Sequence, residues 1–224
     1  MTHATFFRLG MAVTALTALT ACGNTPPVPD WQLNAKGALE RATEAYFTGN
    51  ARVEVLEFER ARSAIASTGL VDQLARAELL RCATRVASLV VEPCAGFVPL
   101  RQDAPAAEQA YADYLAAQWA PAAVPLLPAP QRAVATASGD AAAAQAVKGI
   151  EDPLSRLVAA GVLFRAGRAS PEVIALAVDT ASAQGWRRPL MAWLGLQLQL
   201  ADKAGVTDEA ARIRRRLLLV QGER

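Results

Sequence analysis

Apolar side chains recur every three or four residues over most of this chain, a spacing that places them on one face of an α-helix. One stripe shows the spacing clearly and consists of Leu74, Ala77, Leu80, Ala83 and Ala87. Alanine, leucine, arginine and glutamate dominate such segments, whereas runs of β-branched residues are scarce. The pattern therefore predicts an all-α fold.

Turn residues divide residues 31–120 into four predicted helices. These run from Trp31 to Thr48, from the turn Gly49-Asn50 to Gly69, from Val71 to a point before Pro93, and from Ala104 to Trp119. A proline-rich connection at residues 121–130 follows and marks the best internal boundary, either a joint or a rigid strap. We therefore expect an N-terminal helical part, 31–120, and a C-terminal helical part, 131–224.

The C-terminal part begins with weak, alanine-rich helices and continues with clearer ones. The helix openings are marked by Asp152-Pro153, Ser170-Pro171, Pro189 and Thr207. Two antiparallel hairpins are predicted, because short turns at Gly167-Arg168 and Gly205-Val206 make neighbouring helices antiparallel.

The first 22 residues follow another pattern: a positive start with Arg8, an apolar run from Leu9 to Thr20, and small residues before Cys22. The run is too short to span a membrane and is typical of an export signal. Its end, Leu19-Thr20-Ala21-Cys22, resembles the lipobox of a bacterial lipoprotein. The alternative is a cytosolic protein with an apolar first helix, which the following Gly-Asn-Thr-Pro-Pro-Val-Pro segment disfavours.

The lipoprotein resemblance implies that residues 1–21 are removed as a signal peptide and that Cys22 carries a thioether lipid and a fatty acyl chain such as palmitate. Several acyl chains together hold a protein firmly on a membrane. Gly23 stands where inner-membrane lipoproteins tend to have Asp, so the resemblance favours the outer membrane, with the body on the periplasmic face. Residues 22–30 make a proline-rich tether between the anchor and the body.

Composition excludes several classes of function. The chain carries 23 basic and 21 acidic residues, and this near balance excludes a charge-driven nucleic-acid binder. The one histidine, His3, lies within the predicted signal, so the mature chain has none. That excludes Ser-His-Asp and Cys-His catalysis and histidine-ligated metal sites. We therefore assign no catalytic, cofactor-binding or metal-ligating residue.

Two cysteines, Cys82 and Cys94, remain beside Cys22 in a compartment that oxidises thiols. They predict a disulfide, and Pro93 must end the preceding helix so that the chain can fold back. The alternative is a pair of buried free thiols.

A further resemblance surrounds the turn at Gly49. The small, aromatic and turn positions of a tetratricopeptide repeat are similar to Ala42, Ala45, Gly49, Phe58 and Ala61. The chain departs from that repeat at Glu54, where a small residue is usual, and the later hairpins resemble it more faintly. The resemblance implies an array of helical hairpins with a concave face that binds protein. An irregular α-bundle is the alternative.

Four clusters of large or charged residues are interpreted as structural. We expect the stripe of Trp186, Leu190, Trp193 and Gln197 to belong to the core, and likewise Tyr111, Tyr114 and Trp119. The run of Arg212, Arg214, Arg215 and Arg216 is interpreted as a solvated face, with anionic lipid or an acidic partner as the alternative. We expect a solvent-facing helix with local ion pairs from Glu54, Glu57 and Glu59 beside Arg52, Arg60 and Arg62.

The sequence thus predicts a membrane-anchored lipoprotein that acts as a non-catalytic adaptor for another envelope protein. One alternative is a peptidoglycan-acting enzyme that uses a carboxylate, for which the candidates are Glu40, Glu44, Glu78, Glu108 and Glu172. The other alternative is a periplasmic ligand carrier.

Overall fold

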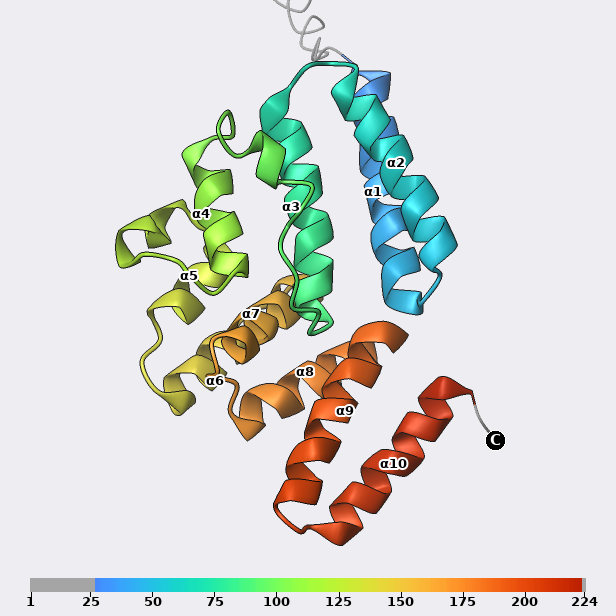
Figure 1. Cartoon of the computed structure of the whole chain (residues 1–224), viewed down its shortest axis with the longest axis vertical. Coiled ribbons are helices and arrows are strands. Elements are labelled where there is room, and N and C mark those ends of the chain that lie inside the picture. The colour runs from blue at the N-terminus through green and yellow to red at the C-terminus, as the bar shows by residue number, and fades with distance from the viewer. Residues whose placement is uncertain (1–26, 223–224) are drawn as a thin grey trace, which may run out of the picture. The chain divides into compact units, whose positions relative to one another are not determined.

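Helices make up all the regular structure of residues 27–222, which are the residues that the computed structural model describes (Figure 1). The α-helices are α1 (Asp30–Thr48), α2 (Ala51–Ala66), α3 (Val71–Ala87), α4 (Ala106–Leu115), α5 (Ala129–Thr136), α6 (Asp140–Lys148), α7 (Pro153–Arg165), α8 (Pro171–Ala183), α9 (Arg187–Lys203) and α10 (Thr207–Gln221). Two short 3₁₀ helices, η1 (Val98–Leu100) and η2 (Pro121–Leu126), join them. The all-α prediction is confirmed. The predicted signal sequence and Cys22 lie outside the described residues.

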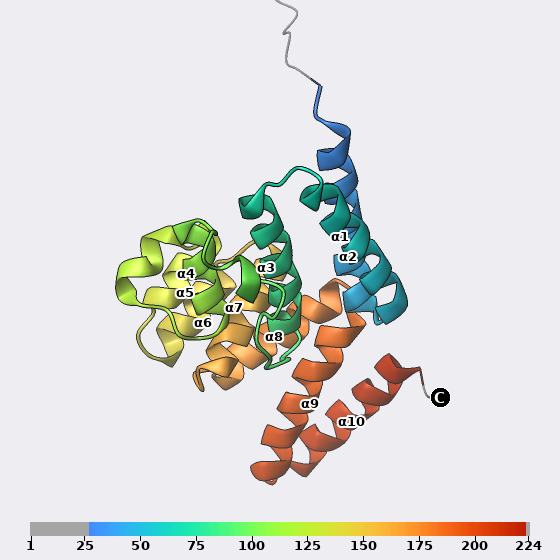
Figure 2. The same ribbon diagram turned by 45° about the horizontal axis from the view of Figure 1, so that its top comes forward.

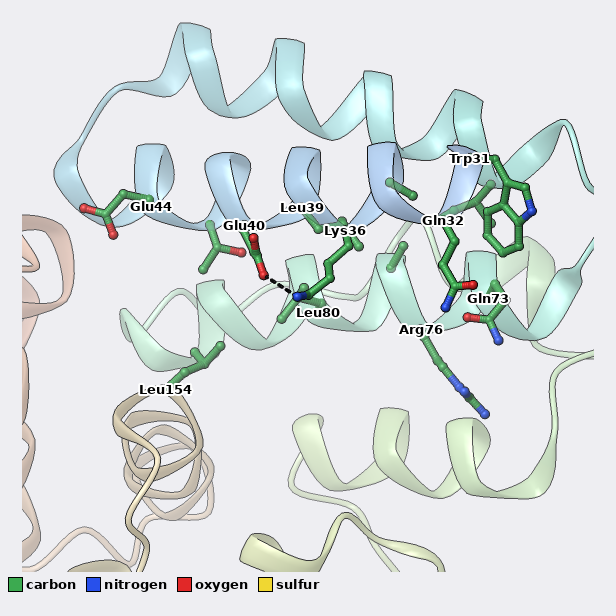
Figure 3. Close-up of a pocket in the computed structure, with 14 residues that line it drawn as sticks. Trp31, Gln32, Lys36, Leu39, Glu40, Glu44, Gln73, Arg76, Leu80 and Leu154 are labelled. Carbon is green, nitrogen blue, oxygen red and sulfur yellow. Dashed lines mark ion pairs between the residues drawn. The ribbon is translucent and has the colours of Figure 1, made fainter. Parts of the chain in front are cut away.

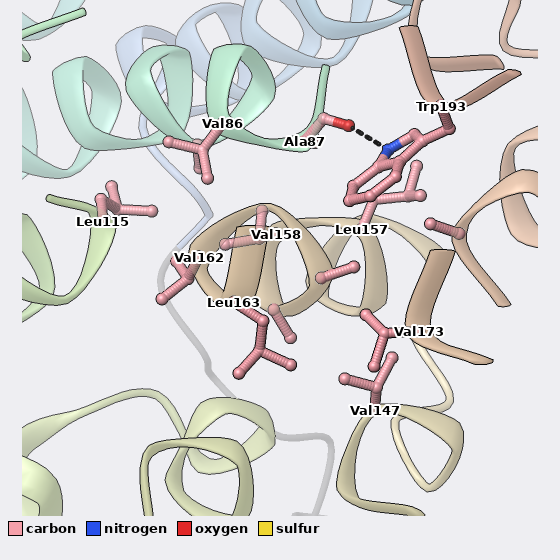
Figure 4. Packing of buried hydrophobic residues seen from close by; sticks show 14 of the residues in the cluster. Val86, Ala87, Leu115, Val147, Leu157, Val158, Val162, Leu163, Val173 and Trp193 are labelled. Carbon is pink, nitrogen blue, oxygen red and sulfur yellow. Dashed lines mark hydrogen bonds between the residues drawn. The ribbon is translucent and has the colours of Figure 1, made fainter. Parts of the chain in front are cut away.

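Helices α3, α4, α5, α6 and α8 pack against α7, whose buried side chains include Leu157, Val158 and Leu163 (Figure 4). On its neighbours, α3 and α8, lie Val86 and Val173, which belong to the same core. That core takes residues from both predicted parts of the body. Trp31–Arg224 form one compact unit with its own apolar core, which meets the physical requirements for independent folding.

Six helices end in the same backbone motif. After each, one residue adopts a positive φ, and the next amide donates a hydrogen bond to the carbonyl five residues back, as Asn50 does to Ala45 at 2.7 Å. Glycine supplies the positive φ at positions 49, 167, 185 and 205. The two predicted hairpin turns, at Gly167 and Gly205, are among them and join α7 to α8 and α9 to α10.

The other two motifs use non-glycine residues. Helix α3 ends before Pro93 as predicted, but it is Leu89, with φ +60°, that closes it at Ala87, and not Pro93. Ala117, with φ +59°, closes α4 at Leu115 instead of Trp119. A leucine or alanine with a positive φ is uncommon, so no pattern in the sequence predicts that a helix ends at either residue.

The proline-rich connection, predicted to be a joint or a strap, contains η2 and leads into α5. Prolines at the first or second positions open both helices, which suits a residue with a fixed φ and no amide hydrogen. Asp152 and Ser170 cap α7 and α8 as predicted, each accepting a hydrogen bond from the amide three residues on.

The residues that resemble a tetratricopeptide repeat lie at the packed positions of α1 and α2. Ala42, Ala45, Phe58 and Ala61 are all buried. Glu54, where the chain departs from the repeat, is buried as well, and its Oε1 accepts hydrogen bonds from Arg81 and Arg85 of α3. A salt-bridged carboxylate therefore fills a place that is usually given to a small side chain.

The prediction of a solvent-facing charged helix was wrong for Glu54 and Glu57. Both carboxylates are buried. Glu54 binds arginines of α3 only, whereas Glu57 binds Arg41 of α1 as well as the local Arg60. The prediction that the aromatic residues belong to the core is confirmed for Trp193 and Tyr114, which are fully buried, whereas Trp186 and Trp119 are half-buried. Adjacency in sequence suggested local ion pairs, but the carboxylates face the helices packed against α2.

Candidate binding groove

A groove of about 600 Å³ runs between α1 and α3 (Figure 3). Its floor is apolar and consists of Ala35, Leu39, Ile65, Ala77 and Leu80. Trp31 lies at one end, and Leu154 of α7 and Glu44 lie toward the other. We call this feature the α1/α3 groove. Its volume falls within the range of ordinary ligand sites.

Polar side chains border this floor without covering it. Lys36 and Glu40 form an exposed ion pair of 3.5 Å along α1. Gln32 faces Gln73 and Arg76 of α3 near the end of the groove that Trp31 closes (Figure 3). An apolar floor with a few polar groups at its edge is the usual composition of a binding site.

A second cavity, of about 450 Å³, lies on the other side of Arg76 and shares Arg76 and Leu80 with the groove. It is lined mainly by apolar residues of α3, α4 and the η2–α5 segment: Leu79, Ala107, Tyr111, Leu126, Leu127 and Pro128. We call it the α4 cavity. Burial raises the pKa of the Tyr111 hydroxyl, so this side chain stays neutral.

Arg76 lies between the α1/α3 groove and the α4 cavity, and its side chain is more than half exposed. Its Nε donates a 2.6 Å hydrogen bond to Oε1 of Glu108, and this bond raises the pKa of the guanidinium. Glu108 is buried, and its second oxygen, Oε2, has no hydrogen-bond partner among the described residues. The pair therefore offers spare donors on Arg76 beside an acceptor that still lacks a donor.

Buried carboxylates hold the groove walls together. Glu57 of α2 accepts a 2.9 Å hydrogen bond from Arg41 of α1, and Glu78 of α3 accepts one of 2.9 Å from Arg62 of α2. The hydrogen bond from Arg41 holds the pKa of Glu57 below its ordinary value. Removing the arginine of such a pair leaves a buried carboxylate uncompensated, whereas Arg41 and Arg62 are themselves partly exposed.

The C-terminal end of α1 is fixed against α9. Phe47 is fully buried and stacks on Trp186, with ring centroids 4.4 Å apart. Arg188 lies over the ring of Tyr46 and donates a 2.8 Å hydrogen bond to the Tyr46 carbonyl. These contacts position one wall of the groove.

The cysteine pair lies away from the groove. Cys82 and Cys94 are at disulfide distance, with Cα atoms 5.4 Å apart. They border a separate small cavity with Arg81 and Arg85. We interpret the bridge as a tie between α3 and the loop after it.

Of the carboxylates considered for catalysis, Glu40 and Glu44 border the α1/α3 groove and Glu108 borders the α4 cavity. Glu78 pairs with Arg62, and Glu172 is exposed at the start of α8. Within residues 27–222, no three His, Cys, Asp or Glu side chains converge as metal ligands would. Sequence reasoning identified Leu80 and Ala77 as a stripe but missed the groove, because the pattern of one helix does not identify the helix that lies beside it.

None of the helices in the described part of the chain is both long and apolar enough to cross a membrane. No family model matches the chain, and comparisons with curated proteins and with solved structures find no match.

Proposed function

We propose that this protein is a lipid-anchored, non-catalytic adaptor of the bacterial envelope that binds a segment of another protein in the α1/α3 groove. The observation that carries the binding proposal is the apolar floor of this groove, left open between two helices and bordered by polar groups. The anchoring proposal is supported by the lipobox resemblance that ends at Cys22.

The α1/α3 groove and the α4 cavity, with Arg76 between them, favour a segment that has two apolar side chains separated by an acidic one. One apolar side chain would lie on Leu39 and Leu80 in the groove, and the other in the α4 cavity. Arg76 stands between them, exposed enough to donate to a carboxylate.

A peptide-display selection on the purified protein tests the binding proposal. Peptides enriched on the wild type should lose at least about tenfold in affinity for Leu39→Glu, since a charge on the floor costs more than about 1.4 kcal/mol of binding free energy. Leu33→Glu is the matched control, because Leu33 lies on α1, is exposed and does not border the groove. Equal binding to both variants would contradict the proposal.

The ligand carrier has a specific observation in its favour, namely that the same apolar floor would suit a small apolar molecule. Native mass spectrometry distinguishes the two functions. A small molecule that co-purifies with the wild type and is lost from Leu39→Glu would establish the carrier.

The anchoring proposal has its own test: Cys22→Ala should move the protein from the membrane to the soluble fraction, and unchanged membrane association would refute it.

A further inference from the structure

The last two helices carry a charge that the rest of the body does not share. Residues 187–222 contain seven basic and three acidic side chains, a net charge of +4. Residues 27–186 contain 14 basic and 17 acidic side chains, a net charge of −3. The α9–α10 hairpin is therefore the part of the described chain that an anionic surface attracts.

Helix α10 lies beside α9 at the edge of the body in both ribbon views (Figures 1 and 2). It is packed through one side, where Ala210 and Ile213 are buried. Its other side is exposed to solvent and carries Arg212, Arg215, Arg216, Leu218 and Leu219. We call these five residues the outer face of α10. Leu219 is 77% exposed, which is the highest value among the large apolar side chains described.

Two arginines of the outer face have no acidic partner among residues 27–222. Arg212 is paired with Glu209, and Arg214, beside the outer face, is paired with Asp202 of α9 at 2.6 Å. Arg215 and Arg216 form no ion pair with any residue between 27 and 222. Both side chains are exposed, so within the described part of the chain their guanidinium groups remain open to an anion.

We propose that the outer face of α10 binds the surface of a bilayer that contains anionic phospholipid. Arg215 and Arg216 bind lipid phosphates, and Leu218 and Leu219 enter the region just below the headgroups. An acidic protein would neutralise the arginines equally well, but leucines exposed among them match a surface with acyl chains directly beneath its phosphates. The contact is independent of Cys22 and would fix how the body faces the membrane.

Vesicle flotation of residues 27–224 tests this contact without the proposed anchor, since this part contains the whole compact unit. We expect binding to vesicles of phosphatidylcholine mixed with phosphatidylglycerol to be at least about tenfold stronger than binding to phosphatidylcholine alone, at roughly fivefold for each free arginine. Equal binding to the two kinds of vesicle, or none to either, would overturn the proposal. An acidic protein as the true partner would give that result.

Charge reversal locates the contact. Arg215→Glu with Arg216→Glu should abolish the preference for anionic vesicles, whereas Arg52→Glu with Lys148→Glu should change it less than about twofold. The control pair makes the same change in net charge at exposed sites on α2 and α6. An equal loss in both variants would show a non-specific effect of net charge and refute the assignment to α10. Circular dichroism verifies that each variant is folded.

The contribution of Leu218 and Leu219 is measured separately, as vesicle binding at high salt. Leu218→Ser with Leu219→Ser should remove the part of the binding that survives high salt, because salt screens the arginines and leaves apolar insertion intact. Unchanged binding at high salt would exclude leucine insertion and overturn this part of the proposal.

Discussion

At the scale of single residues, two helices end at residues whose side chains disfavour the backbone conformation that they adopt. Leu89 and Ala117 have a positive φ at the position of the helix-ending motif that Gly49, Gly167 and Gly205 occupy in other helices. The left-handed conformation costs an ordinary residue about 1–2 kcal/mol, a cost that glycine does not bear. The glycine ends could be predicted from the sequence, but those at Leu89 and Ala117 depend on tertiary packing and could not.

Ala117→Gly should therefore raise the free energy of unfolding by about 1 kcal/mol. Ala116→Gly is the matched control, because Ala116 has a helical φ of −79° and gains nothing from glycine. Urea denaturation of the three proteins measures the difference. A lower stability for Ala117→Gly than for the wild type would contradict the observed backbone.

The carboxylate of Glu57 makes stability depend on pH. Its pKa is lowered in the folded protein by the hydrogen bond from Arg41, so its contribution is present above the unfolded pKa, about 4.3, and is lost as pH falls through the folded value. Glu57→Gln should therefore be less stable than the wild type at neutral pH, with the gap narrowing below about pH 4. Denaturation across this range measures the gap. Glu59→Gln, at an exposed residue, should show none.

At the scale of elements, periodicity predicted most helices and both hairpin turns, but not which helices touch. The crossing of α3 and α7 shows why. A Cβ on Gly161 would lie 2.2 Å from the carbonyl oxygen of Val86, so the two backbones meet only because residue 161 is glycine. An isolated glycine within a helical pattern does not identify its partner helix. The buried carboxylates Glu54 and Glu57 were misassigned for the same reason, since Glu54 pairs with arginines of α3 and Glu57 with Arg41 of α1 besides the local Arg60.

Gly161→Ala should destabilise the protein by about 1–3 kcal/mol, because the added methyl group forces the backbones of α3 and α7 apart. Gly195→Ala in α9 should be neutral or stabilise by up to about 1 kcal/mol, since nothing lies within 4 Å of its Cβ position and alanine favours a helix. Thermal unfolding compares the two. Equal melting temperatures for both variants would refute the close crossing.

The Cys82–Cys94 bridge should stabilise the fold by about 3 kcal/mol, as expected for a loop of this length. Reduction with dithiothreitol should lower the denaturation midpoint of the wild type. The Cys82→Ala, Cys94→Ala double variant should not respond to the reductant. A wild type that is insensitive to reduction would mean that the cysteines are free thiols.

At the scale of the whole molecule, a proposed lipid anchor at Cys22 is joined to a helical body that presents an apolar groove. The anchor could be predicted from the sequence, because the segment that resembles a lipobox is a short local motif. The α1/α3 groove could not be predicted in the same way, because the residues that line it are far apart along the chain, from Trp31 of α1 to Leu154 of α7.

In-cell crosslinking of the full chain tests the central claim, that a membrane-held body binds a protein segment in the groove. A photoreactive residue replaces Leu39, and the same residue at Leu33 is the control. The account predicts a covalent adduct with one protein from position 39 alone, recovered in the membrane fraction. Adducts that form equally from both positions, or that appear in the soluble fraction, would contradict it.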